Sequence, residues 1–199
     1  MVHGKKLVID AKGHIVGRLA AYVAKSLREG YSVVLLRAEG TIFSSPIDRM
    51  VSIYKDKKRK RCLVNPKKGP FHYKEPSKCL KRVVRGMLNY KGARGAEDYA
   101  RLKVYDGIPM EYELVERVVV TQALAETKLN PVTKTSTMGQ LCERMGWTSA
   151  GLLEKFESER LKRVAVAEKE KEMKNQKKSD LVSSDAFKRE LDSILANIE

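Results

Sequence analysis

Two features of this chain could carry chemistry. One is its set of histidines and cysteines, which can bind metals, and the other is a turn between two glycines near the start. The histidines and cysteines are His3, His14, His72, Cys62, Cys79 and Cys142. They are scattered, with no histidine at i, i+4 spacing from another histidine or a cysteine and no CxxC pair, so neither a metal site nor a disulfide framework is predicted. We therefore expect no bound metal and a reducing compartment, which indicates a cytoplasmic protein.

The glycine-bracketed turn is Gly13-His14-Ile15-Val16-Gly17, placed between a predicted strand and a predicted helix. Its spacing matches neither the GxGxxG dinucleotide motif nor the GxxxxGK[ST] phosphate loop. A tight turn that needs the conformational freedom of glycine explains the pattern better. No cofactor is predicted here.

Motifs for catalysis are absent from the rest of the sequence, which has no GxSxG elbow, kinase signature or HExxH stretch. We therefore predict a binding protein and not an enzyme. A cytosolic α/β enzyme acting on a phosphorylated substrate remains the alternative, because a βα turn in a basic chain could bind phosphate.

The strongest functional signal is charge. Lys and Arg number 40 against 25 Asp and Glu, which gives a net charge of +15 and a pI near 9.7. Residues 55–103 hold 17 basic and 4 acidic residues, a net of +13, so the remainder of the chain contributes only +2. This concentration favours a nucleic-acid partner over an ordinary solvated surface. A membrane surface is disfavoured because the chain has no lipidation motif and no apolar run of about 18 residues.

Within the basic segment, the cations are interrupted by proline and glycine and accompanied by aromatic residues, which suits a loop that follows an RNA backbone. The residues expected to contact RNA are Lys55, Lys57, Lys58, Arg59, Lys60, Arg61, Lys67, Lys68, Phe71, His72, Tyr73, Lys78, Arg82, Arg85, Lys91 and Arg94. Phe71 and Tyr73 could stack on unpaired bases, or could instead anchor the loop to the core. The sequence leaves both interpretations open.

These residues must be positioned by a fold with alternating strands and helices. Apolar spacing predicts strands at residues 6–9, 32–37, 102–105 and 117–120, and helices at 16–27, 47–54, 77–88, 96–101, 138–145 and 150–176. Ser77 is expected to N-cap its helix, residues 55–75 to form an extended loop, and residues 177–180 to break the long helix. Strand, helix and strand at the start predict a right-handed βαβ unit.

Several motifs in this order carry a family resemblance. They are Val8-Ile9-Asp10-Ala11-Lys12-Gly13-His14, Gly17-Arg18-Leu19-Ala20, Asn65-Pro66, Gly69-Pro70-Phe71-His72-Tyr73, Pro76-Ser77, Arg85-Gly86-Met87-Leu88, Arg94-Gly95, Leu102-Lys103-Val104-Tyr105-Asp106-Gly107-Ile108-Pro109, Val118-Val119-Val120 and Gly146-Trp147. The chain resembles the universal large-subunit ribosomal protein thirteen family, in its eukaryotic and archaeal branch, and its long tail is similar to eukaryotic cytosolic members. Ser44-Ser45-Pro46, Lys67-Lys68 and Asn89-Tyr90 depart from that family's usual residues.

The resemblance implies a fold, a function and partners. The implied fold is a three-layer α/β/α domain with a mostly parallel four-stranded sheet. We expect this rRNA-binding domain at residues 1–130, with its basic loop at 55–76, and a helical C-terminal extension at 131–199. The implied function is that of a structural constituent of the cytosolic large ribosomal subunit that binds large-subunit rRNA, with assembly in the nucleolus. An extra-ribosomal role in regulating translation could coexist with it.

The C-terminal segment carries a further expectation. From Ser184 onward an apolar stripe recurs at helical spacing, namely Phe187, Leu191, Ile194, Leu195 and Ile198. We expect it to dock on a neighbouring large-subunit ribosomal protein or on the chain's own long helix, because its acidic residues make phosphate a poor partner. A frayed tail is the alternative.

Overall fold

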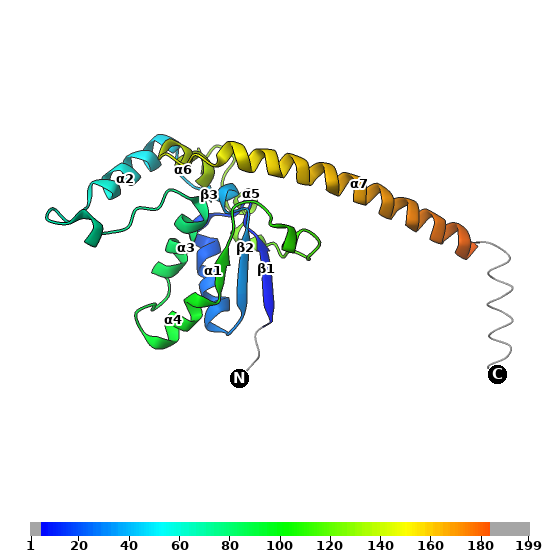
Figure 1. Cartoon of the computed structure of the whole chain (residues 1–199), viewed down its shortest axis with the longest axis horizontal. Helices are drawn as coiled ribbons and strands as arrows, with labels where there is room; N and C mark the ends of the chain where they lie inside the picture. The colour runs from blue at the N-terminus through cyan, green and yellow to red at the C-terminus, as the bar shows by residue number, and fades with distance from the viewer. Residues whose placement is uncertain (1–4, 184–199) are drawn as a thin grey trace. The chain divides into compact units, whose positions relative to one another are not determined.

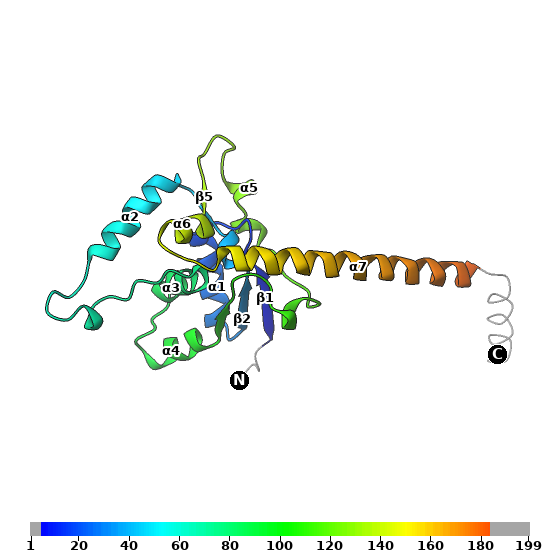
Figure 2. The same cartoon turned by 45° about the horizontal axis from the view of Figure 1, so that its top comes forward.

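The computed structural model of the chain describes residues 5–183 (Figures 1 and 2). The strands are β1 (Lys6–Asp10), β2 (Ser32–Leu36), β3 (Ile42–Phe43), β4 (Leu102–Val104) and β5 (Ser136–Thr137). The α-helices are α1 (Val16–Arg28), α2 (Ile47–Arg59), α3 (Pro76–Gly86), α4 (Ala93–Ala100), α5 (Ala125–Lys128), α6 (Met138–Arg144) and α7 (Ala150–Ser183). Short 3-10 turns are η1 (Ala38–Gly40), η2 (Pro66–Lys68), η3 (Met110–Tyr112) and η4 (Thr121–Ala123). Contacts group the chain into two compact units, Met1–Leu153 and Glu154–Glu199, while the expected division at residue 130 stays a prediction.

The main sheet is parallel, with strand order β1-β2-β4, so the mixed α/β class and the parallel pairing are confirmed. The expected four strands are wrong, because the segment at residues 117–120 makes only a single bridge, between Val118 and Ile9. Val118 N–H donates to the Val8 carbonyl at 2.8 Å, but the Val120 N–H already turns away to His14 at 3.0 Å. The segment therefore leaves the sheet before a ladder can form. A separate antiparallel pair, β3 and β5, completes the strands.

The two faces of the sheet carry separate apolar clusters. Ile9 and Leu35 face the larger core, into which α1 and α3 send their apolar sides. Val8 and Val34 face the opposite side, where Tyr105, Ile108 and Tyr112 pack over them. Among the described residues of Met1–Leu153, this second face of the sheet is therefore covered by a loop that contains the 3-10 turn η3. The expected three-layer fold would have helices there. Neighbouring residues such as Val8 and Ile9 face opposite sides because side chains along a strand alternate between its two faces.

The helix α2 is longer than expected, because it continues through residues 55–59 to Arg59 instead of ending at Tyr54. Its first turns have a reason to fold, since Ile47, Val51 and Tyr54 are partly buried. The added turn is fully exposed and basic. Lys and Arg are good helix formers, and cations near a helix C-terminus interact favourably with its dipole. The proposed extended loop therefore starts only after Arg59.

The long helix α7 is also longer than predicted. Residues 177–180 were expected to break it, yet it continues through Ser183. The stretch contains no proline or glycine, and the Ser179 hydroxyl donates to the Gln176 carbonyl at 2.7 Å without interrupting the helix. The apolar stripe predicted from Ser184 lies outside the described residues. No α-helix within residues 5–183 is long and apolar enough to cross a membrane.

The glycine-bracketed turn is held by a buried histidine. Gly13 adopts φ +78°, which favours glycine, while Gly17 lies inside α1. His14 is fully buried. Its Nε2 accepts from the Val120 N–H at 3.0 Å, which leaves Nδ1 to donate to the Lys12 carbonyl at 3.1 Å. His14 is therefore a structural residue that joins the turn to the segment leaving the sheet.

We predict that His14→Ala lowers the free energy of unfolding by about 3 kcal/mol, since it opens a cavity and leaves the Val120 N–H without its acceptor. Urea unfolding followed by circular dichroism measures the loss. His72→Ala is the matched control, because His72 is exposed and its removal is expected to cost about 0.5 kcal/mol or less. Equal effects of the two substitutions would contradict the structural role of His14.

Candidate nucleic-acid interface

The position of the candidate interface depends on how α3 begins. Pro76 occupies its first turn and Glu75 is the N-cap residue, without a side-chain cap. Ser77 is therefore not the N-cap, which corrects the sequence prediction. Its backbone N–H and its hydroxyl instead donate to the two carboxylate oxygens of Asp106, each at 2.8 Å. Asp106 lies two residues after β4, so this pair ties the start of α3 to the end of a sheet strand.

The helix α3 has the two faces that its sequence predicts. Cys79, Leu80 and Val84 are buried against the larger core. Arg82 lies on the exposed side, and Arg85 is partly exposed with its guanidinium 4.7 Å from the ring centroid of Tyr90. Because the apolar residues hold the helix in place, its cations are presented outward at a fixed orientation.

The helix α2 presents the second set of cations. It packs against α6, and Arg144 of α6 donates to Asp48 of α2 at 2.8 Å. In both Figures 1 and 2, α2 and the segment after it extend away from the sheet on the side of α3. The last turn of α2 carries Lys57, Lys58 and Arg59. Two cationic helices therefore border the segment that joins them.

That connecting segment is pinned at its base. His72 Nε2 lies 3.0 Å from the carbonyl of Lys60, which holds the two arms of the loop together. Arg82 donates to the carbonyl of Phe71, and its guanidinium lies 5.9 Å from the ring centroid of Tyr73. Phe71 remains 68% exposed, whereas Tyr73 is 37% exposed. The two aromatic residues thus differ, since Tyr73 packs on Arg82 and Phe71 points its ring surface to solvent.

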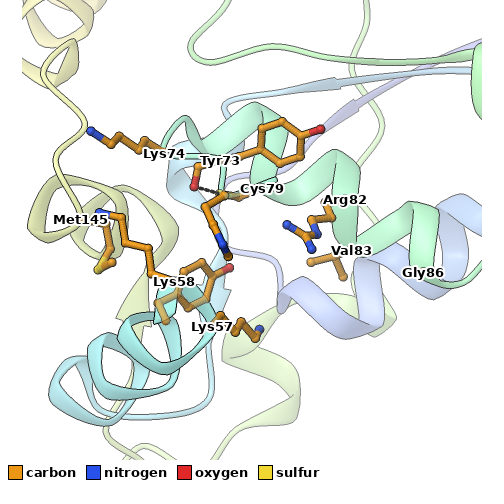
Figure 3. A pocket seen from close by; sticks show the side chains of 11 residues that line it. Lys57, Lys58, Tyr73, Lys74, Cys79, Arg82, Val83, Gly86 and Met145 are labelled. Carbon is orange, nitrogen blue, oxygen red and sulfur yellow. Dashed lines mark hydrogen bonds between the residues drawn. The ribbon is translucent and has the colours of Figure 1, made fainter. Parts of the chain in front are cut away.

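A cavity of about 370 Å³ lies between α2, the loop and α3 (Figure 3). Its lining residues are Tyr54, Lys57, Lys58, His72, Tyr73, Lys74, Cys79, Arg82, Val83, Gly86 and Met145. The sequence prediction included five of them as RNA contacts and did not include the other six, which are Tyr54, Lys74, Cys79, Val83, Gly86 and Met145. Tyr54 could have been found from its spacing on α2, whereas Met145 is brought in only by the tertiary fold.

Burial and a thiol–thiol hydrogen bond shift the ionisation of Tyr54, Cys79 and Cys142, of which the first two line this cavity. Desolvation raises the pKa of Tyr54 above its usual value of 10, so its phenol stays neutral and can donate a hydrogen bond. A hydrogen bond with Cys142 lowers the pKa of the Cys79 thiol, and the same contact together with burial raises the pKa of Cys142. Cys79 also donates to the carbonyl of Tyr73 at 3.5 Å. These thiols therefore serve packing between α3 and α6.

The structure gathers some predicted contact residues and separates others. Lys55, Lys58, Arg59 and Arg61 surround a second hollow with Leu63. Lys67 and Lys68 lie in η2, whose first residues are capped by Asn65. Lys78 is paired with Glu75 at 2.8 Å, and Lys60 and Lys91 are exposed. Arg94 lies apart from the loop, in a hollow with Lys25 and Arg28 of α1.

The edge where an α/β enzyme would bind a ligand is occupied by internal contacts. In parallel sheets, ligands bind at the carboxyl ends of the strands. Here Asp10 at the end of β1 accepts two hydrogen bonds from Arg37, one of them 2.9 Å long from Nε. Glu39 accepts from the Gly107 N–H at 3.0 Å. These polar groups hold the edge together, which disfavours the enzyme alternative.

Comparisons of the sequence with known proteins show its family. A family model described as ribosomal protein L13 matches residues 4–111 of the chain. The chain is also similar to the large ribosomal subunit protein uL13 of Spodoptera frugiperda, with 42% identity over 171 residues, which covers 85% of this chain and 84% of the insect protein. The region matched by the family model includes β1, α3 and all of the cationic segment at residues 55–103.

The contact between Ser77 and Asp106 makes a pH-dependent contribution to stability. Burial raises the pKa of the Asp106 carboxyl, against the opposing effect of its two hydrogen bonds. Because the folded pKa lies above the unfolded value of about 4, the folded state holds the proton more tightly. Stability from this group is therefore greatest below the unfolded pKa and falls as pH rises through the folded pKa.

Asp106→Asn keeps one acceptor oxygen for the Ser77 N–H, and its amide NH2 can donate to the Ser77 hydroxyl oxygen in place of the second bond. It has no charge to desolvate, so we expect it to gain stability relative to the wild type as pH rises from 4 to 7. Asp106→Ala loses both hydrogen bonds and is expected to be less stable by about 1–3 kcal/mol. Urea unfolding of the three proteins across this pH range measures both effects. A difference between wild type and Asp106→Asn that does not change with pH would contradict the argument.

Proposed function

Since the chain belongs to the ribosomal protein L13 family, we propose that it binds large-subunit rRNA through the cationic surface formed by α2, α3 and the loop between them. Its role in the large ribosomal subunit is structural and non-catalytic. The observation that carries the proposed interface is the concentration of charge, because residues 55–103 supply +13 of the net +15. Phosphate contacts dominate the affinity of proteins for nucleic acids.

The arrangement of the cations supports binding by shape. Two helices with fixed orientation and a pinned loop hold their charges at set positions, so an RNA backbone of matching shape is favoured over other polyanions. Lys78 and Arg59 share their charge with Glu75 and Asp56, at 2.8 Å and 3.5 Å. We therefore expect Lys57, Lys58 and Arg82 to contribute more to phosphate binding than Lys78 does.

The remaining proposals concern the parts of the chain and its location. We assign rRNA binding to the α/β domain at residues 1–130 and contacts with neighbouring ribosomal proteins to the helical extension at 131–199. The relative from Spodoptera frugiperda is a large-subunit protein, which supports a place in the cytosolic ribosome. Assembly in the nucleolus follows as a proposal from the same relationship.

Changing Lys57, Lys58, Arg59, Lys60 and Arg61 together to Ala is expected to weaken rRNA binding and to make its salt dependence shallower. Each phosphate contact contributes about 0.7 to 0.9 to the slope of log affinity against log salt, so the slope should fall by up to about four. Filter binding to large-subunit rRNA at several salt concentrations measures the slope. Incorporation into large subunits should fall in parallel.

The matched control removes the same charge from α7, by changing Lys162, Arg163, Lys169, Lys171 and Lys174 to Ala. If the two sets lower the slope equally, binding depends on net charge alone and the assignment of the surface is wrong. Sedimentation separates the family role from the enzyme alternative, because a free enzyme would stay in the soluble fraction at moderate salt. Co-sedimentation with the large particle is the expected result.

A truncation after Ser183 tests the proposed contacts of the C-terminal extension. It removes residues 184–199, including the predicted apolar stripe, and keeps α7. We expect large subunits that contain the truncated chain to lose or weaken one neighbouring protein, because the stripe would no longer be buried there. Mass spectrometry of purified subunits measures their composition. Subunits with full protein content and normal yield would contradict docking of this segment on a neighbouring protein.

A further inference from the structure

The cavity between α2, the loop and α3 combines two kinds of wall. Tyr54, Val83 and Met145 supply apolar and aromatic surface, and Tyr54 is partly buried. The Tyr73 ring and the Arg82 guanidinium, 5.9 Å from its centroid, lie at the same cavity. Flat aromatic and guanidinium groups are the surfaces on which unstacked nucleobases pack.

The charges around the cavity are all of one sign. Lys57, Lys58, Lys74 and Arg82 line it, and the described lining residues include no Asp or Glu. Figure 3 shows that these side chains come from α2, the loop and α3. A ligand with a planar apolar part and a negative charge fits this lining, whereas a basic or purely aliphatic ligand does not.

The size of the cavity agrees with such a ligand. About 370 Å³ lies at the lower end of the range of roughly 300 to 1,000 Å³ that is usual for pockets holding small organic molecules. The neutral phenol of Tyr54 can also donate to a base edge. A complete helix of RNA could not enter, but one nucleotide turned out of its stack could.

We propose that this cavity binds a single unstacked nucleotide of the bound RNA, with the base between the aromatic walls and the phosphate among Lys57, Lys58 and Lys74. This inference rests on the proposed function and adds to it a contact with a base, where the cationic surface alone contacts phosphates. The exposed Phe71 lies outside the cavity lining. The base contact therefore belongs to the cavity and not to every aromatic residue of the loop.

Gly86 allows the cavity to be filled without changing any charge. It is the last residue of α3 and lines the cavity, and a Cβ added to it would meet no atom within 4 Å. Gly86→Leu therefore adds an apolar side chain at the wall of the cavity while leaving the cations intact. Gly17→Leu is the matched control, because Gly17 also lies in a helix with nothing within 4 Å of an added Cβ and is not among the cavity's lining residues.

The test compares two single-stranded probes, a uridine decamer and a decamer of the same length with abasic residues throughout. Full-length wild-type protein is expected to bind the uridine strand about 5- to 100-fold more tightly, which is the range expected for stacking of one base. Gly86→Leu should reduce this ratio to about one, with an unchanged salt slope. Gly17→Leu should keep the wild-type ratio. Circular dichroism melting checks that both variants remain folded.

Several results would overturn the proposal. If Gly86→Leu retains the wild-type ratio, or if wild type does not distinguish the two strands, the cavity does not bind a base, although salt-dependent binding of both strands would leave the proposed function standing. Failure to bind either strand counts against both. Uridine monophosphate is expected not to compete at micromolar concentration, and efficient competition would assign the cavity to a free nucleotide.

A second measurement does not depend on any variant. Ultraviolet cross-linking of wild-type large subunits, followed by mass spectrometry, should find a nucleotide attached to a peptide that contains Tyr54, Tyr73 or Cys79. The lining places all three side chains at the cavity. A cross-link from these peptides to another protein, or solvent accessibility of Tyr73 in the intact particle, would show that no nucleotide occupies the cavity.

Discussion

Two hydrogen bonds from Ser77 to Asp106 decide where the cationic surface lies. They fix the first turn of α3 to the residue after Tyr105, at the carboxyl end of β4, so the orientation of the helix is set by the sheet. The apolar side of α3 is then buried on α1 and the strands, so its basic side is turned away from the core and toward solvent. Arg82 in turn holds the loop at Phe71 and Tyr73. Loop, cavity and surface all depend on this one attachment.

A surface of this charge repels itself, and the structure offsets the repulsion locally. Lys57, Lys81 and Arg85 lie over the rings of Tyr54, Tyr99 and Tyr90, at 4.8, 5.1 and 4.7 Å from the centroids. Such contacts stabilise a cation without neutralising it. The C-terminal position of three cations on α2 has the same effect through the helix dipole. The charges therefore remain available to a polyanion while the protein alone stays folded.

The residue types that suggest catalysis are used for packing. His14 joins a turn to the segment that leaves the sheet, and Cys79 and Cys142 pack α3 against α6. Asp10 and Arg37 close the carboxyl edge of the sheet. In an α/β fold this edge is the usual ligand site, so its closure by these contacts argues against a ligand site of the kind that α/β enzymes have.

The sequence alone determined the features that follow from local spacing. The strand, turn and helix at the start, the two faces of α3 and the concentration of charge were all readable, because periodicity and composition act over a few residues. Only the tertiary structure decided the number of strands, since Val120 is drawn to His14 instead of the sheet. It also decided that Met145 lines the same cavity as Tyr54 and that Arg94 shares a hollow with Lys25 and Arg28 of α1, because residues far apart in the chain come together there. Hydrophobic spacing and composition describe only neighbouring residues, so they cannot predict such long-range contacts.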